Sequence, residues 1–444
     1  MIINPELRRN LWLEFTTQRL IVTPLIIGAI LYLCYLTGIV SVLKVAYFIF
    51  MFYLFLWGTK LASESIPDEI NNRTWDFQRL SVIKPWTLSW GKLLGSPAYA
   101  WYGALLALIP YIIISLQTQT PASIALKVFI LILGGLFAHS VALLFSMNAL
   151  QYEKNTKVST FFYFLIGLLF GWIATHSTLN AFLFNDAYAP FKWYSFNIDF
   201  TFYLYSLCIF LVWSVIGIYR SMRSALQYPT LPWVWFVFTV FCMVYFSGFF
   251  IWKIEKFDDI MRAIPDALPK YVAFSVAVFI TYLALFSEKI NVITYKKIIH
   301  NVTKPKKAPK WIASFILVII MGIWISFSPS IKFHELNFIP VVFITSAILF
   351  LIRDILIIHY FQFADNPKRA VITSVFYITV LYLLAPGLAN ALTNYKSVLF
   401  FLPGSGKDWI ISLLSPAVQA AFMIFMVKQR WRAQSTSTNS ISVS

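Results

Sequence analysis

The chain has 444 residues, of which 59% are hydrophobic and only 12% are charged. Soluble chains carry about 25% charged residues, so this composition excludes a soluble globule and predicts an all-α polytopic membrane protein. The formal net charge is +17, but the basic residues are spread over short loops between apolar runs. The positive-inside rule accounts for such a distribution, so we exclude nucleic acid as a partner and expect a lipid bilayer.

The N-terminal stretch Pro5–Arg19 mixes leucines with charged residues, which predicts an interfacial helix that leads into the first span. The first apolar run starts near Leu20, behind Arg8 and Arg9, and has no convincing small-residue cleavage site. We therefore expect a retained first span and no cleavable signal peptide.

Apolar runs of roughly 18–25 residues recur along the chain, and each is long enough to cross a hydrocarbon core of about 30 Å as a helix. By this criterion we predict about a dozen membrane spans. They lie at about residues 20–38, 43–59, 94–116, 123–148, 159–177, 200–219, 231–252, 271–287, 311–328, 338–360, 370–390 and 409–428.

The longest polar interruption in the first third of the chain is Lys60–Lys92, between the second and third predicted spans. Ser65 suits a helix N-cap, Pro67 the first turn and Asp68 the positive helix end. We therefore predict an amphipathic helix over about 63–84 that lies along the membrane surface. The helical period places Ile66, Ile70, Thr74, Phe77 and Leu80 on its apolar face. The charged face and its flanks carry Asp68, Glu69, Asn72, Trp75, Asp76 and Arg79.

Trp75 is the unusual member of that charged face. One interpretation is a tryptophan at the lipid headgroup boundary. The other is an anchor that inserts into a partner's pocket, because Trp and Arg are favoured at interface hot spots.

This layout resembles that of permease subunits of ABC transporters of the type-two exporter class. In that family a charged, amphipathic coupling helix lies on the cytoplasmic side between the second and third spans, and a Leu, a Pro and a Gly-Lys pair follow it. Leu80, Pro85 and Gly91-Lys92 occur here in that order. Asp68-Glu69 and Arg73-Thr74 stand where the family has acidic residues followed by Gly-Thr. The resemblance covers roughly residues 1–150, and Arg73 departs from the family's usual glycine.

The resemblance implies the membrane-spanning component of an ATP-driven exporter, a multi-pass protein of the cell's inner (cytoplasmic) membrane. A separate ATP-binding cassette subunit would carry ATP and Mg²⁺, so this chain would hold no catalytic, cofactor or metal site. By resemblance, contact with that subunit falls on the coupling helix, at Asp68, Glu69, Asn72, Trp75, Asp76 and Arg79.

Charge distribution favours an even number of spans with both termini in the cytoplasm, because an odd number would place a strongly basic segment outside. A dozen spans divide naturally into two six-helix halves, residues 1–225 and 226–432. The small, polar tail 433–444 is predicted to be disordered.

If the second half mirrors the first, its own coupling element is the basic loop Glu288–Lys310. The alternative is a loop held to anionic lipid headgroups. Family permeases commonly have six spans and work in pairs, so either one chain supplies the whole pathway or two copies pair.

Other candidate sites are weaker. Gly404–Lys407 reads GSGK, but Phe401 and Asp408 occupy positions where a phosphate-binding loop needs Gly and Ser or Thr. His139, inside the fourth predicted span, is either a hydrogen-bonding partner of a neighbouring helix or a proton or substrate site. The three cysteines, Cys34, Cys208 and Cys242, lie in apolar runs and are expected to pack as small hydrophobic residues.

Arg353 and Asp354 are adjacent, so on a helix they point about 100° apart and are not expected to pair. We predict that the tenth span ends near Leu351 and that the following residues run along the cytoplasmic surface.

Two other functions stay open. An ion-coupled secondary transporter fits the dozen spans, although it needs buried carboxylates and almost all acidic residues here fall in predicted loops. A membrane-embedded, lipid-linked glycosyltransferase would use the paired Asp258 and Asp259 of an outside loop.

Overall fold

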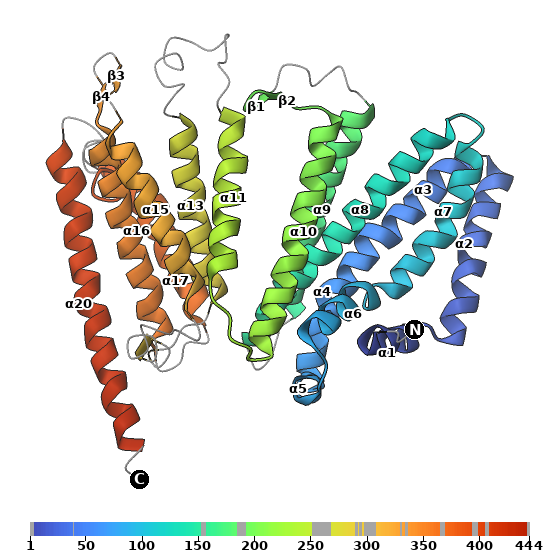
Figure 1. The fold of residues 1–444 in the computed structure, drawn as a ribbon, viewed down its shortest axis with the longest axis horizontal. Coiled ribbons are helices and arrows are strands. Elements are labelled where there is room, and N and C mark those ends of the chain that lie inside the picture. Colours follow the sequence, from blue (N-terminus) through green and yellow to red (C-terminus); the bar gives the residue numbers. More distant parts are fainter. Residues whose placement is uncertain are drawn as a thin grey trace. The chain divides into compact units, whose positions relative to one another are not determined.

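The computed structural model describes residues 4–38, 40–151, 157–183, 192–250, 268–288, 292, 295–296, 308–328, 331–333, 336–364, 369–392, 398–404 and 408–441. The helices belong to two compact units (Figure 1). The first unit comprises Met1–Phe191 and Asn197–Thr230, and the second comprises Lys192–Phe196 and Leu231–Ser444. The main division falls after Thr230, while the two six-helix halves that we placed at residues 1–225 and 226–432 stay a prediction.

Among the described residues, ten helical stretches are long and apolar enough to cross a membrane, so the chain is an all-α polytopic membrane protein. Six of these stretches belong to the first unit: α2 (Thr17–Thr37), α3 with η1 and α4 (Val42–Met51, Phe52–Trp57, Gly58–Asn71), α7 (Ala98–Ser115), α8 (Pro121–Ser146), α9 (Lys157–Leu183) and α10 (Phe200–Ala225). Four belong to the second unit: α13 (Leu268–Ser287), α16 (Pro340–Gln362), α17 with η6 and α18 (Ala370–Thr379, Val380–Leu384, Ala385–Leu392) and α20 (Trp409–Ile441).

The remaining two predicted spans, 231–252 and 311–328, coincide with shorter apolar helices, α11 (Trp233–Ser247) and α15 (Lys310–Ser326). Every predicted span therefore has a helix, while the count of twelve crossings and the cytoplasmic termini stay predictions. Two short pairs of strands lie between helices. β1 (Lys192–Trp193) pairs with β2 (Phe196–Asn197), and β3 (Ile331–Phe333) pairs with β4 (Leu336–Phe338) in the antiparallel sense.

The end of α20 differs from our expectation of a disordered tail after residue 432, because the helix continues to Ile441. The physical reason lies in the sequence. No Pro or Gly occurs between Lys428 and Ile441, so nothing there interrupts the helical hydrogen bonds.

Three short helices of the first unit gather at one end of its bundle: α1 (Pro5–Glu14), α5 (Trp75–Leu80) and α6 (Pro85–Gly95) (Figure 1). The stretch in which we predicted an interfacial helix thus contains α1, which ends at Glu14, and its placement at the membrane interface stays a prediction. Its N-cap is Asn4, whose side chain accepts hydrogen bonds from the backbone N–H groups of Glu6 and Leu7.

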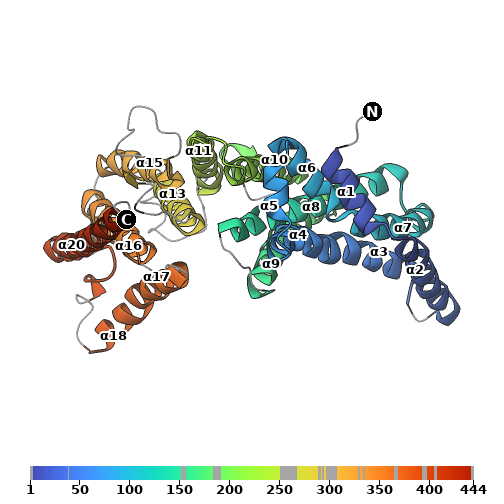
Figure 2. The same cartoon turned by 90° about the horizontal axis from the view of Figure 1, so that it is seen from below.

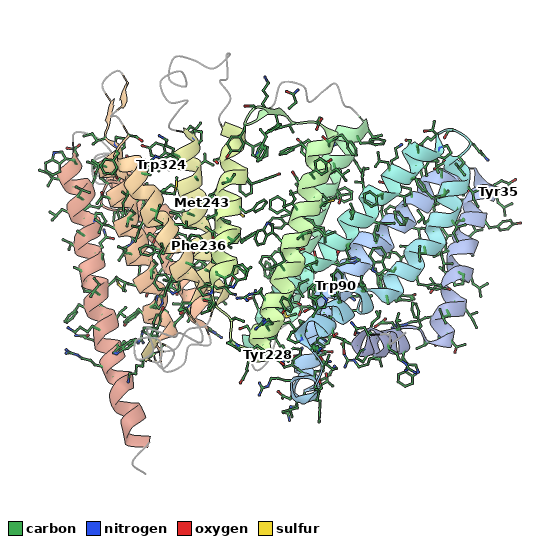
Figure 3. The ribbon with its side chains drawn as sticks, in the orientation of Figure 1. Tyr35, Trp90, Tyr228, Phe236, Met243 and Trp324 are labelled. Carbon is green, nitrogen blue, oxygen red and sulfur yellow. The ribbon has the colours of Figure 1, made fainter. Side chains whose placement is uncertain are left out.

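Large apolar side chains cover the outer faces of both units (Figure 3). Tyr35 of α2 and Trp324 of α15 are exposed, whereas Met243 of α11 belongs to the buried core of the second unit. Outward-facing apolar surface of this extent suits contact with lipid tails.

Small residues bring α8 and α9 into close contact. A Cβ atom at Gly171 would lie 2.4 Å from the Cβ of Ala138, and one at Gly167 would lie 2.6 Å from the Cβ of Ala142. Each helix thus presents two small residues four positions apart, the pattern that allows membrane helices to approach closely.

We expect Gly171→Val to separate α8 from α9 and to lower the thermal unfolding midpoint and the monodisperse yield in mild detergent. The matched control is Gly28→Val in α2, because a Cβ at Gly28 meets no atom within 4 Å. Equal stability of the two variants would contradict this account of the α8–α9 contact.

Candidate functional site

The segment expected to form the coupling helix is two helices joined by a tight turn. α4 does not begin at Ser65; it continues the second span without interruption to Asn71, with Pro67 inside it. Our N-cap prediction was therefore wrong. The physical reason is burial: Ala62 and Ile66 pack into the core, which sustains the helix through the single hydrogen bond that Pro67 removes.

A Schellman turn ends α4. Arg73 N–H donates to Ile70 O at 3.1 Å, and Thr74 N–H donates to Glu69 O at 2.9 Å. Arg73 occupies the left-handed position of this turn, with φ of 58°, a conformation that glycine adopts most readily. This is the position at which the resembling family has glycine.

The turn directs α5 back against the bundle and buries Trp75, which we predicted on the charged face. Trp75 is 8% exposed and packs against a core cluster that includes Ile66 and Leu88. Phe77 and Leu80, predicted on an apolar face towards lipid or the bundle, are 77% and 81% exposed and so do not pack against the bundle. The placement of Trp75 was wrong because one helical period was continued across a turn that resets it.

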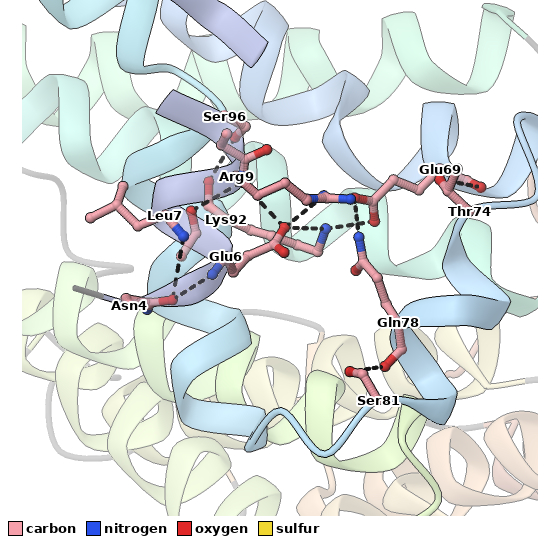
Figure 4. Close-up of polar contacts among 12 residues, drawn as sticks. Asn4, Glu6, Leu7, Arg9, Glu69, Thr74, Gln78, Ser81, Lys92 and Ser96 are labelled. Atoms are coloured by element: carbon pink, nitrogen blue, oxygen red, sulfur yellow. Dashed lines mark hydrogen bonds and ion pairs between the residues drawn. The ribbon is translucent and has the colours of Figure 1, made fainter. Parts of the chain in front are cut away.

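Buried charges connect the elements at this end of the first unit. Lys92 of α6 is fully buried, and its Nζ lies 2.5 Å from Glu69 Oε2 and 3.2 Å from Glu6 Oε1. Arg9 of α1 pairs with Glu6 at 2.8 Å and also with Glu69. We call Glu6, Arg9, Glu69 and Lys92 the four-charge cluster (Figure 4). Its formal charges sum to zero, which a buried site requires.

Hydrogen bonds add to the four-charge cluster. Gln78 of α5 donates from Nε2 to Glu69 Oε1 at 2.5 Å, and Asn10 of α1 donates to Glu6 Oε1 at 3.2 Å. Burial lowers the pKa of Arg9, but the hydrogen bond and charge of Glu69, with the charge of Glu6, outweigh this effect and hold that pKa above its usual value. α1, α4, α5 and α6 are thereby joined through one carboxylate-centred network.

Two glycines allow α1 to reach this position beside α6 (Figure 2). A Cβ atom at Gly91 would lie 2.5 Å from the Cβ of Glu6, and one at Gly95 would lie 2.8 Å from the Cβ of Asn10. Asn4 also donates to Thr87 O at 2.7 Å. Pro85 starts α6 at its first position, where a missing N–H costs nothing.

The six predicted contact residues therefore separate into two groups. Asp68, Asn72, Asp76 and Arg79 are exposed, whereas Glu69 and Trp75 are buried. Sequence reasoning did not identify Glu6, Arg9, Gln78 and Lys92 as their partners. The available signal was the presence of charged residues in α1 and of the Gly91-Lys92 pair, but their proximity depends on tertiary structure.

His139 makes a structural contact between helices. It is fully buried in α8, and its Nε2 lies 2.8 Å from the carbonyl oxygen of Leu54. Leu54 belongs to η1, a π-helical turn that alters the regular hydrogen-bond pattern of its helix. Gly58 provides the space, because a Cβ there would lie 2.2 Å from His139 Nε2. This is the first of the two roles that we considered for His139.

Arg353 and Asp354 contradict our prediction for the tenth span. α16 does not end near Leu351 but continues to Gln362, and both charged residues are buried within it. They also pair directly, with Arg353 Nε 2.8 Å from Asp354 Oδ1. The Cα–Cβ bonds of adjacent helical residues point in different directions, but the long Arg353 side chain bends back to reach Asp354. Burial favours this pairing, because an unpaired buried charge is costly.

Most of the proposed second coupling element, Glu288–Lys310, lies outside the described residues. The two ends of this loop are hydrogen-bonded to each other, because Lys310 N–H donates to Glu288 Oε2 at 2.8 Å. Within the loop, the Tyr295 hydroxyl lies 2.5 Å from His359 Nε2. Burial raises the pKa of Tyr295. Asp258 and Asp259 also lie outside the described residues, as do positions 405–407 of the GSGK sequence.

The three cysteines are free; Cys242 is buried, and Cys34 and Cys208 are partly buried. Within the described ranges, no group of three His, Cys, Asp or Glu side chains is arranged to hold a metal ion.

Comparisons with known proteins add no identification. No family model, no curated protein and no solved structure matches the chain.

We expect Lys92→Met to lower the free energy of unfolding by about 3 kcal/mol, because it leaves the four-charge cluster with an uncompensated carboxylate. Adding Glu69→Gln restores neutrality between Glu6 and Arg9, so the double variant should recover part of that loss. Unfolding in detergent measures both, with exposed Lys84→Met as the control. A double variant less stable than Lys92→Met would contradict the charge-balance argument.

Arg73→Gly is expected to be neutral or stabilising, within about 1 kcal/mol, since glycine removes the steric cost of a positive φ. Arg73→Val should destabilise the protein by about 1–2 kcal/mol at the same position, because its branched Cβ is disfavoured there. The same unfolding measurement tests the pair, and the opposite order would contradict the Schellman turn.

Proposed function

We propose that this chain is the membrane-spanning permease component of an ATP-driven exporter of the type-two class. In this proposal α5 is the contact for a separate ATP-binding subunit. The observation that carries the proposal is the four-charge cluster, which holds a projecting helix rigidly between the second and third membrane-spanning helices.

The connection of α5 to the bundle suits mechanical coupling. α4 is continuous with the second span, and α6 ends at Gly95, just before α7 begins at Ala98. The cluster joins both sides of α5, because Glu69 belongs to α4 and Lys92 to α6. A displacement of α5 would therefore move the second and third spans together.

The outer face of α5 suits a protein partner. Phe77 and Leu80 are exposed beside the opposite charges of Asp76 and Arg79. Aromatic and apolar anchors flanked by Arg are typical of the energetic centres of interfaces. Trp75, buried behind this face, would support its shape without touching the partner.

Arg73 supports the resemblance at the level of the backbone. At the position where the resembling family has glycine, Arg73 has a positive φ, a conformation that glycine adopts most readily.

The ion-coupled alternative draws on Asp354, a buried carboxylate within a candidate span. That carboxylate is already paired with a permanent cation, Arg353. A paired carboxylate is a poorer carrier of protons or sodium than a free one, so the exporter is the better-supported function.

Co-purification tests the exporter proposal. The tagged protein, extracted from its native membrane in mild detergent, should retain an ATP-hydrolysing subunit. Phe77→Ala combined with Arg79→Ala should reduce the retained ATPase activity about tenfold or more, because both residues occupy the proposed contact.

The matched control is Phe327→Ala, which removes an equally exposed phenylalanine from the second unit. Retention unchanged in the Phe77/Arg79 variant would disprove the α5 contact. A wild-type protein that purifies without any ATPase would overturn the exporter proposal itself.

A further inference from the structure

A buried polar cluster in the second unit is not used by the proposed exporter mechanism. It consists of Arg353 and Asp354 of α16, Tyr282 of α13, Tyr382 of η6 and Gln419 of α20, and we call it the Arg353 cluster. Arg353 is 1% exposed and Asp354 is fully buried. At about 1.5 Å per residue, Arg353 lies about 20 Å along α16 from Pro340 and about 14 Å from Gln362, well inside a candidate span.

The carboxylate of this cluster is well supplied with donors. Asp354 Oδ1 accepts from Arg353 Nε at 2.8 Å. Its Oδ2 accepts from the hydroxyls of Tyr282 at 2.5 Å and Tyr382 at 2.7 Å. A carboxylate that already accepts three hydrogen bonds, one of them from a cation, has little capacity left for a further donor or a metal ion.

The guanidinium, by contrast, has unused donors. Nη1 of Arg353 donates to Gln419 Oε1 at 2.7 Å. Gln419 is fixed in this orientation, because its Nε2 donates to Phe400 O at 2.7 Å and to Ser415 Oγ at 3.0 Å. Within the described part of the chain, Nη2 of Arg353 is buried without any hydrogen-bond partner.

From this asymmetry we propose that the Arg353 cluster is an intramembrane binding site for the anionic head of an amphiphile, a phosphate or carboxylate oxygen that accepts from Arg353 Nη2. A buried, charged donor without a partner is costly, and polar side chains inside a membrane mark ligand pathways by default. The unpaired group, Arg353 Nη2, is a hydrogen-bond donor that carries positive charge, so it favours an anionic acceptor and disfavours a cation. The aromatic rings of Phe350 and Tyr382, 4.7 Å and 5.0 Å from Arg353 Cζ, stabilise the guanidinium in place.

The helix that carries Tyr382 provides a route of access. α17 packs mainly against α16, and the outer residues Leu383 and Leu384 are exposed. A helix packed along one side is more easily displaced than a core helix, and η6 interrupts its regular hydrogen bonding. Displacement of Tyr382 would uncover Arg353 to a ligand arriving from the bilayer. This site does not depend on the α5 contact or on an ATPase.

The test measures binding of ³²P-labelled dodecyl phosphate to the purified full-length protein in a non-ionic detergent. Wild type should bind it at one saturable site, and unlabelled dodecanol, which has the same chain without the anion, should not compete. Arg353→Lys should bind about tenfold or more weakly, because the compact ammonium lacks the extended planar fork with which the guanidinium reaches Asp354, Gln419 and a ligand in different directions.

Two further variants keep the test decisive. Arg353→Gln with Asp354→Asn removes both charges without leaving either unpaired, so it should fold and lose binding. Arg430→Gln is the matched control, since Arg430 lies outside the cluster and contacts Tyr360; its binding should equal that of wild type. Equal binding by all variants, effective competition by dodecanol, or no saturable binding to wild type would each overturn the proposal.

Competition also identifies the source of the anion. Displacement of the label by phosphatidylglycerol would assign the site to a bilayer lipid. Displacement by single-chain phosphates alone would assign it to a soluble amphiphile. Either result upholds recognition of an anionic head by Arg353.

Discussion

Lys92 is an ammonium with no access to water, and such a charge is stable only where anionic oxygens surround it. Glu6 and Glu69 supply them, and Arg9 balances the second negative charge. The position of α1 beside α6 and the closure of α5 onto α4 both depend on this neutral arrangement. The exposed face of α5 is thus presented by a rigid base.

The second unit meets the same constraint differently. Arg353 neutralises the charge of the adjacent Asp354, and two tyrosine hydroxyls from separate helices donate hydrogen bonds to that carboxylate. Nη2 of the Arg353 guanidinium is nevertheless buried without a hydrogen-bond partner. The first cluster is balanced and hydrogen-bonded on several sides, which suits a structural role. Each cluster leaves one buried arginine nitrogen without a hydrogen-bond partner, Arg9 Nε in the first and Arg353 Nη2 in the second. The two differ in burial, because the Arg9 side chain is 37% exposed whereas Arg353 is 1% exposed.

Two π-helical turns recur beside buried polar side chains. In the first unit, η1 contains Leu54, whose carbonyl oxygen contacts His139. In the second, η6 contains Tyr382, which donates to Asp354. A π turn changes both the hydrogen-bond pattern and the direction of the side chains that follow it. Each turn therefore carries one polar contact within a largely apolar helix.

The sequence by itself determined the class of the protein and the positions of its helices, because hydrophobic length is a local property that no tertiary contact needs to supply. It also located the polar segment between the second and third spans. Tertiary structure alone decided which face of that segment is buried. The Schellman turn at Arg73 contains no glycine that would reveal it in the sequence. The partners of Glu69 include Arg9 and Lys92, which are distant from it in the sequence. The pairing of Arg353 with Asp354 could not be predicted from the sequence either, because helical periodicity gives the direction of each Cβ and not the reach of a long side chain. Charge pairing across helices depends on distances that only the folded chain defines.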